Sequence, residues 1–178
     1  MHLPRFPSPA ENSCLVSDQD CKITVRITVN NPQINGVVLE DIDLPGTPDE
    51  TTRMWAEWVS RQIFPNDHDW QDMLKARICV VCDDVLRFLL DTATEITARI
   101  KLREDAKTVK KGGLWYEEAL PTETILSGLV VATPTQKVSI STTEVFQTLE
   151  GLLTKALQFG GKSTVGRGLC RLQLTGGN

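Results

Sequence analysis

The sequence has no apolar run that approaches the length of a membrane span, and prolines interrupt residues 1–13, where a secretory leader needs its apolar core. Positive charge is scarce too, because the net charge is −4 and the isoelectric point about 5.2. Such a balance argues against a free-standing module that holds nucleic acid by bulk charge. Five cysteines, an odd number at irregular spacing, fit reduced thiols better than a disulfide framework. We therefore predict a cytoplasmic, soluble protein without a membrane partner, whose contacts with RNA or DNA are local or shared with other subunits.

The length and composition are those of one folded domain. With 178 residues, 40% of them hydrophobic and 24% charged, the chain is long enough to bury a core. We expect a single domain over residues 1–178, without internal repeats or low-complexity tracts. Three prolines and several small polar residues make residues 1–20 an irregular lead-in.

Hydrophobic periodicity predicts strands and helices in mixed order. Strands are expected at residues 23–29, 36–42, 77–82, 96–102, 114–120, 125–132 and 169–174. Helices are expected at residues 48–63, 69–75, 84–90 and 142–159. Residues 44–48 are expected to turn the chain, and the strands at 114–120 and 125–132 to form a hairpin or meander. Antiparallel-style strands with intervening helices predict an α+β sandwich whose helices cover one sheet face.

Three helices carry start signals. Thr47 is expected to cap the first, with Pro48 as its first residue. Asp83 or Asp84 is expected to cap the third. Ser141 and Glu144 fit the S-x-x-E capping box at the start of the last helix.

A glycine-rich stretch, GGKSTVGRG, spans Gly160–Gly168 and is the most distinctive feature of the chain. Glycine allows positive φ and close approach of the main chain to a ligand. Exposed amides beside Lys162 and Arg167 therefore predict a phosphate cradle, and the alternative is a helix C-cap followed by a plain turn. The stretch is not a nucleotide-binding P-loop, because Ala156 stands where that motif needs glycine and a helix, not a strand, is expected before it. The residues that would form this cradle are Gly160, Gly161, Lys162, Ser163, Thr164, Gly166, Arg167 and Gly168.

Tyr116, Glu117 and Glu118 form a second candidate group. A phenol and two carboxylates on one strand could perform acid–base chemistry or line an RNA path. Side chains alternate along a strand, so Glu117 and Glu118 should face opposite sides. The alternative is a strand with one hydrated face.

Cys79 and Cys82 form a single C-x-x-C pair. A zinc site needs a second pair of ligands at suitable spacing, and the sequence offers none. A redox motif would begin a helix after a strand, whereas two valines within a strand pattern separate these cysteines. We interpret them as buried strand cysteines and predict no metal site.

Three stretches in a fixed order give a family resemblance. VCDDVLRFLLDTATEITARIKL, then GGLWYEEALPTETILSGLV, then QFGGKSTVGRGLCRL resemble the C-terminal portion of RAMP-superfamily backbone subunits of type III-B CRISPR (Cmr) effector complexes. The resemblance implies a ferredoxin-like core of the RNA-recognition-motif type. It also implies a ribonucleoprotein in antiviral defence, in which copies of the subunit and other Cmr-type subunits assemble on a CRISPR guide RNA and present complementary target RNA for cutting. Gly160–Gly168, with Lys162 and Arg167, would then bind the guide RNA by contacting its phosphates or by stabilising the loop that does. Tyr116 with Glu117 or Glu118 would lie near the target strand.

The resemblance covers the later part of the family pattern only. Family members begin with a strand and a loop that carries an aspartate needed for metal-dependent cleavage, and no residue here matches that aspartate. The N-terminal part of the family fold is therefore expected to be missing, and the isolated chain to need a partner segment. We expect a subunit that binds guide RNA without its own cleavage centre or cofactor, with a divalent metal ion only if cleavage is retained. The alternatives are an endoribonuclease that uses Glu117 or Glu118 with a metal ion, and a protein-only scaffold piece.

Overall fold

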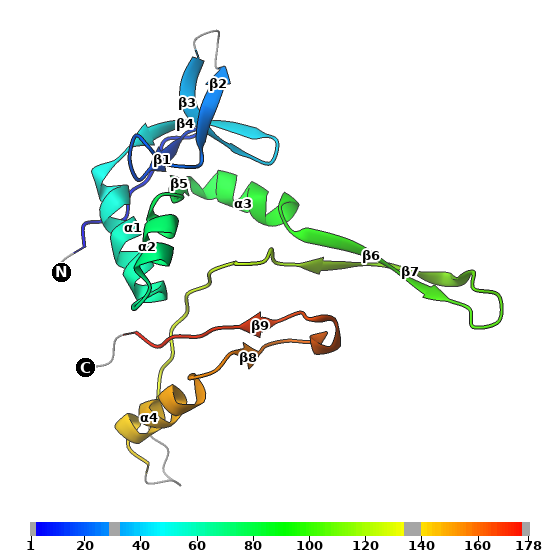
Figure 1. Ribbon diagram of the computed structural model, residues 1–178. Coiled ribbons are helices and arrows are strands. Elements are labelled where there is room, and N and C mark those ends of the chain that lie inside the picture. The colour runs from blue at the N-terminus through cyan, green and yellow to red at the C-terminus, as the bar shows by residue number, and fades with distance from the viewer. Residues whose placement is uncertain (1–2, 29–32, 134–139, 176–178) are drawn as a thin grey trace. The chain divides into compact units, whose positions relative to one another are not determined.

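A computed structural model of the chain describes residues 3–28, 33–133 and 140–175 (Figure 1). The chain divides into two compact units, Met1–Ile125 and Leu126–Asn178. Among the described residues, the first unit contains a five-stranded sheet, three helices and a separate two-stranded hairpin. In the same part of the chain, the second contains one α-helix, one turn of 3-10 helix and one pair of very short strands.

The main sheet has the strand order β2-β3-β4-β1-β5. The strands are β1 (Cys14–Val16), β2 (Thr24–Thr28), β3 (Gln33–Leu39), β4 (Ile42–Pro48) and β5 (Cys79–Val81). Neighbouring strands are antiparallel except β1 and β4, which pair in parallel with Cys14 opposite Gly46. The sheet is therefore mixed, with one parallel pair in an otherwise antiparallel sheet.

Close packing between β2 and β3 depends on glycine at position 36. A Cβ added to Gly36 would lie 2.2 Å from Cδ1 of Ile27 and 2.6 Å from the carbonyl oxygen of Leu44. Ile27 is only 4% exposed and is the buried residue of β2. The missing side chain thus leaves room for Ile27 in the interior.

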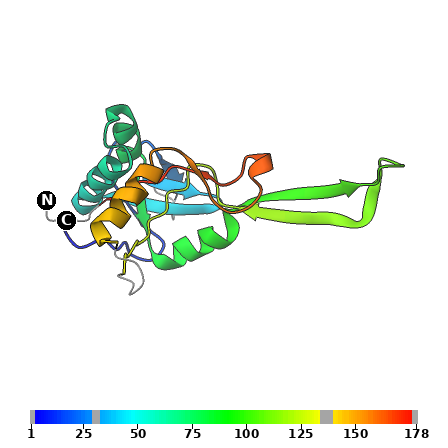
Figure 2. The same cartoon turned by 90° about the horizontal axis from the view of Figure 1, so that it is seen from below.

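Helices α1 (Glu50–Ile63) and α2 (His68–Lys75) pack against each other (Figures 1 and 2). Asp49 caps α1, because its carboxylate accepts from both the amide (2.6 Å) and the hydroxyl (2.9 Å) of Thr52. The fully buried face of α1 consists of the small residues Thr52, Ala56 and Ser60, spaced one turn apart. These small side chains allow the close approach of neighbouring elements.

The hydrophobic core of the first unit lies between the main sheet and helix α3 (Asp83–Thr92). Its six buried residues are Cys14, Val16, Cys21, Val37, Leu44 and Val85. Leu89 packs against this cluster from the next turn of α3. Burial of such side chains is the main favourable term in folding, at roughly 25 cal/mol for each Å² of apolar surface removed from water.

Strands β6 (Glu95–Leu102) and β7 (Val109–Ala119) follow α3 and form a long two-stranded hairpin (Figures 1 and 2). The register pairs Ala98 with Tyr116 and Arg99 with Trp115. One face of the hairpin is apolar and exposed, and its members are Ile96, Ile100, Leu114 and Tyr116. A two-stranded hairpin alone is only marginally stable in water, so this apolar face is expected to be covered in the working protein.

The second unit begins with extended chain and continues with α4 (Thr142–Leu152), β8 (Leu157–Gln158) and β9 (Leu169–Cys170). Ser141 caps α4 and forms the predicted capping box with Glu144, in which each side chain bonds the other residue's amide. Within residues 126–133 and 140–175, no residue is buried. This unit therefore has no core of its own among its described residues.

Several sequence predictions are confirmed. Strand β2, both early helices, strand β6 and the capping box lie where periodicity and capping residues place them. Val29, the last residue of the first predicted strand, lies outside the described residues. The predicted α+β class is confirmed by the mixed sheet and its helices.

Other predictions are wrong. The lead-in 1–20 contains β1, which lies between β4 and β5, and the expected turn at 44–48 belongs to β4. Asp49, not Thr47, caps α1, and Cys82 is the N-cap of α3, with Asp83 and Asp84 in its first turn. Residues 125–132 form no strand, and β7 pairs with β6 instead. The last helix ends at Leu152, so the strand β8 and not a helix leads into the glycine stretch.

Candidate functional site: exposed basic loops

The glycine stretch connects β8 to β9 as a tight loop with a single turn of 3-10 helix, η1 (Ser163–Val165). Four of its residues have positive φ, at 74° for Gly160, 68° for Lys162, 77° for Gly166 and 76° for Gly168. Glycine adopts this region without penalty, whereas Lys162 is a non-glycine residue held there. Three of the four positions with positive φ are thus occupied by glycine, the residue that this backbone conformation favours.

Hydrogen bonds within the loop use several of the amides that were expected to cradle an anion. The Val165 amide donates to the Lys162 carbonyl (3.1 Å), as does the Arg167 amide (3.2 Å). The Gly166 amide donates to the Ser163 carbonyl (3.0 Å). An anion bound here would accordingly be held mainly by side chains, of which Lys162, Ser163 and Thr164 are exposed and Arg167 is half-buried.

Gly168 closes the base of the loop. The Phe159 amide donates to the Gly168 carbonyl (2.8 Å), and the Gln158 side chain donates to the Arg167 carbonyl. A Cβ at position 168 would lie 1.9 Å from the Phe159 carbonyl oxygen. Only glycine fits here, so Gly168 has a structural role that periodicity in the sequence did not indicate.

A strand precedes the glycine stretch, but the stretch still does not form a nucleotide P-loop. The short turn η1 and the strand β9 follow it, where a P-loop would open an α-helix. The first glycine of that motif remains absent, because Ala156 occupies its position. The exclusion holds, although one of its two sequence arguments, the expected preceding helix, was wrong.

The second candidate group lies on β7. Tyr116 and Glu118 share the apolar face of the hairpin, and Glu117 lies on the opposite face, as strand alternation predicts. Tyr116 is 69% exposed, so its ring is accessible to solvent. The Thr94 hydroxyl donates to the Glu118 carboxylate (2.7 Å).

The Glu117 carboxylate joins two neighbouring side chains. Arg99 Nε donates to one of its oxygens (3.2 Å) and Trp115 Nε1 donates to the other (3.1 Å). The Glu117 side chain is only 17% exposed. A carboxylate with both oxygens engaged in this way is better suited to orienting Arg99 and Trp115 than to accepting a proton or binding a metal ion.

The end of the hairpin carries a basic cluster, which we call the hairpin tip, residues 101–111. The tip contains five cations and two acidic residues, a net charge of +3 in a chain whose net charge is −4. Every residue of the tip is exposed. Arg103 pairs with Asp105 (2.8 Å), which lowers the pKa of that carboxyl group. The remaining cations are Lys101, Lys107, Lys110 and Lys111.

Hydrophobic periodicity placed residues 96–102 and 114–120 in strands and did not single out the tip. The signal that could have identified it is the charge run itself, five basic residues within eleven of an otherwise acidic chain. Its position at the free end of a long hairpin became evident only from the register of β6 and β7.

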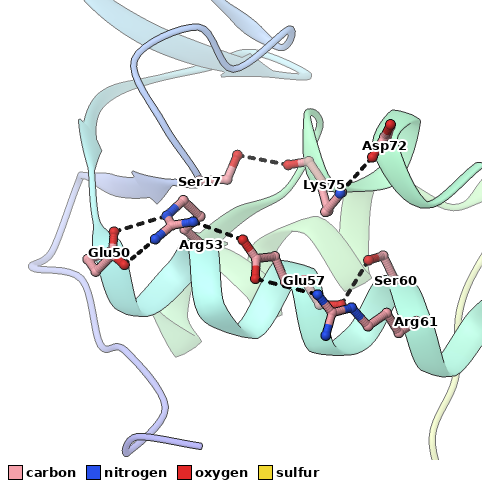
Figure 3. Close-up of polar contacts among 8 residues, drawn as sticks. All are labelled: Ser17, Glu50, Arg53, Glu57, Ser60, Arg61, Asp72 and Lys75. Carbon is pink, nitrogen blue, oxygen red and sulfur yellow. Dashed lines mark hydrogen bonds and ion pairs between the residues drawn. The ribbon is translucent and has the colours of Figure 1, made fainter. Parts of the chain in front are cut away.

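A pocket of about 290 Å³ lies between α1, α2 and the residues that follow β1. Its cations are already paired within the chain. Arg53 bonds Glu50 and Glu57, and Lys75 Nζ lies 2.6 Å from Asp72 (Figure 3). Those contacts lower the pKa of Glu50 and Asp72. The pocket is lined by surface ion pairs along two helices and does not form an anion site. Each such exposed ion pair contributes little to the stability of the fold.

No group of three or more His, Cys, Asp or Glu side chains placed to hold a metal ion occurs within the described residues. The C-x-x-C cysteines are half-buried, with Cys79 in β5 and Cys82 at the start of α3, so only one of them is a strand residue. Over the same part of the chain, no helix is both long and apolar enough to cross a membrane.

These features define an α+β protein with two exposed basic segments, the hairpin tip and the β8–β9 loop. The sequence profile of the RAMP superfamily matches residues 13–171, and the chain belongs to that superfamily. It is 38% identical over 113 residues to the CRISPR system Cmr endoribonuclease Cmr4 of Pyrococcus furiosus, a match covering 64% of this chain and 37% of that protein. It is also 29% identical over 96 residues to the CMR subunit Cmr4 of Saccharolobus solfataricus, covering 54% of this chain and 30% of that protein.

A solved structure supports the same fold. The crystal structure of oligomeric Cmr4 from Pyrococcus furiosus superimposes with a TM-score of 0.51 and 24% identity, covering 91% of this chain and 51% of that chain. The predicted resemblance to Cmr-type RAMP subunits is thereby confirmed, as is the RAMP-type fold. The chain spans about half the length of the solved relative and less of the curated ones.

Proposed function

We propose that this chain is an RNA-binding subunit of a type III-B CRISPR effector complex. Its partners would be the CRISPR guide RNA, complementary target RNA, other Cmr-type subunits and copies of itself. The observation that carries the proposal is the exposed hairpin tip, with a net charge of +3, in a chain related to Cmr4 subunits. The glycine loop, with Lys162 and Arg167, supplies a second basic element.

The location of these cations fits recognition of a phosphate backbone. Basic side chains that bind RNA through its phosphates release counterions, so the binding constant K falls as salt is added. For a single strand, each phosphate contact makes the fall of log K with log salt steeper by about 0.7. An overall acidic chain can bind RNA in this way only where cations are concentrated, as they are at the tip. Binding would therefore be local, salt-dependent and independent of sequence.

The test is the affinity of the full chain for a fluorescent single-stranded RNA, measured over a range of salt concentrations. Replacing Lys107, Lys110 and Lys111 by alanine should make the fall of log K with log salt shallower by about 2. The affinity should decrease by about 100-fold near 0.1 M salt. The matched control replaces Lys22, Arg61 and Arg87, which changes the net charge equally away from the tip. An equal loss of RNA affinity in both variants would show that the effect depends on net charge alone. Unchanged affinity in the tip variant would contradict the role of the tip.

A second candidate function is metal-dependent RNA cleavage, which the name of the Pyrococcus furiosus relative as an endoribonuclease favours. The carboxylates available on β7 are Glu117 and Glu118. Cutting of RNA that requires a divalent ion and disappears in Glu118→Gln would support it. Cutting that persists in both Glu→Gln variants would assign the activity to other residues. A chain that binds no RNA and still joins Cmr-type subunits would be a protein-only scaffold.

A further inference from the structure

Four of the five cysteines lie in the first unit, in or packed against its hydrophobic core. Cys14 and Cys21 are buried, whereas Cys79 and Cys82 are half-buried. Cys14 is 0% exposed and belongs to β1, which lies between β4 and β5. None of these thiols is used by the proposed RNA-binding function, and Cys170, the fifth, is exposed in the second unit.

The register of β1 and β5 places Cys14 beside Cys79. Cys14 is opposite Val81 and Val16 is opposite Cys79 in an antiparallel pair. Side chains directly opposite share a face, and those two residues apart do too, so Cys14 and Cys79 are diagonal neighbours on one face. Interaction between the two thiols raises the pKa of Cys14 and lowers the pKa of Cys79.

We propose that Cys14 and Cys79 form an oxidisable dithiol that peroxide converts to an internal disulfide. The Cys79 sulfur attacks one oxygen of hydrogen peroxide, the O–O bond breaks, and water leaves with the thiol proton, giving a sulfenic acid. The Cys14 sulfur then attacks the Cys79 sulfur, the S–O bond breaks, and a second water leaves. Two thiols and one peroxide thus yield one disulfide and two waters, with sulfur oxidised and peroxide reduced.

Burial sets the order of these two steps. Cys79 is partly accessible, so an oxidant from solvent reaches it before Cys14, which has no exposed surface. The Cys21 thiol donates to the carbonyls of Ala76 (3.3 Å) and Ile78 (3.8 Å), and the Cys14 thiol donates to the Leu44 carbonyl (4.0 Å). The pairing of β1 with β5, which places Cys14 and not Cys21 beside Cys79, therefore assigns the second step to Cys14. A nearby resolving thiol also protects Cys79 from further oxidation, since condensation removes the sulfenic acid.

The product would join the inner strand β1 to the neighbouring edge strand β5. β5 leads through Cys82 directly into α3, which precedes the hairpin in the chain. Diagonal neighbours in a sheet are about 7–8 Å apart, beyond the separation that a disulfide spans without backbone movement, so oxidation requires the two short strands to shift toward each other. The pair is therefore a modification site whose product is confined to one polypeptide.

The test treats the reduced full chain with hydrogen peroxide, blocks the remaining thiols with N-ethylmaleimide, and maps the peptides by mass spectrometry. To remove the exposed thiol, the experiment uses Cys170→Ser, which leaves four cysteines. We expect the number of alkylated thiols to fall by two, a linked peptide pair containing Cys14 and Cys79, and full recovery with dithiothreitol. Peptide mapping keeps the test independent of whether a Cys14 variant folds.

Two variants give matched controls. Cys79→Ser should abolish the loss of thiols, whereas Cys82→Ser, which removes the other half-buried cysteine, should leave it unchanged. A link from Cys79 to Cys82 or to Cys21 would overturn the assignment. So would conversion of Cys79 to sulfinic acid with Cys14 still reduced, or four alkylated thiols after treatment.

Discussion

Replacing Lys162 and Arg167 together by alanine tests whether the glycine loop contacts RNA. Lys162 already has positive φ, at 68°, so alanine there changes one non-glycine residue for another and adds no new backbone restriction. The hydrogen bonds that shape the loop use main-chain atoms of both residues, which the substitutions leave in place. The double variant should therefore keep its loop and lose two cations.

The magnitude follows from counterion release. Two phosphate contacts to a single strand contribute about 1.4 to the slope of log K against log salt. Near 0.1 M salt this corresponds to about 25-fold in affinity, or about 1.9 kcal/mol. Fluorescence anisotropy with a single-stranded RNA measures both quantities, and Lys22→Ala with Arg87→Ala is the control of equal charge. An unchanged slope in the double variant, with its circular dichroism unchanged, would refute a phosphate-contacting role for this loop.

Three further outcomes follow from the fold. Gly168→Ala should disrupt the β8–β9 loop, because its Cβ would lie 1.9 Å from the Phe159 carbonyl oxygen, and faster amide exchange of the Phe159 amide measures this. Leu44→Ala, at a position 1% exposed, should cost about 2 to 5 kcal/mol in chemical denaturation. Ser141→Ala should cost about 1 kcal/mol of α4 stability. The hydrogen bonds from Ser141 lower the pKa of Glu144 in the folded chain. Their contribution to the stability of α4 is therefore present above the unfolded-state pKa of Glu144 and is lost as the pH falls through its folded-state pKa. Helix content measured against pH checks this expectation.

Local chemistry predicted the elements whose signals are local. Alternation around Ile27 predicted β2, and the Ser141–Glu144 pair predicted the start of α4, because each depends on residues within one element. β1 was missed because three residues in a proline-containing segment carry no period, and its position is fixed by pairing with β4 and β5. β4 was taken for a turn because Pro45 and Gly46 are turn residues in isolation, a preference that tertiary pairing overrides.

The candidate sites divide in the same way. Alternation correctly separated Glu117 from Glu118, but only the register showed that Arg99 and Trp115 engage the Glu117 carboxylate. The apolar residues 125–132 resembled a strand because composition reports hydrophobicity and not the presence of a partner strand. Whether the whole chain is a single domain stays a prediction, although the family match extends across both compact units.

The central claim is that this RAMP-superfamily chain binds guide RNA as part of a Cmr-type complex. The most direct measurement isolates the C-terminally tagged chain from its native cells and sequences the RNA bound to it. The account predicts short RNAs that share a repeat-derived 5′ end and differ in their spacers, together with other Cmr-type proteins. Recovery of the soluble chain with no enriched RNA would contradict the account and leave the family relationship as one of ancestry alone.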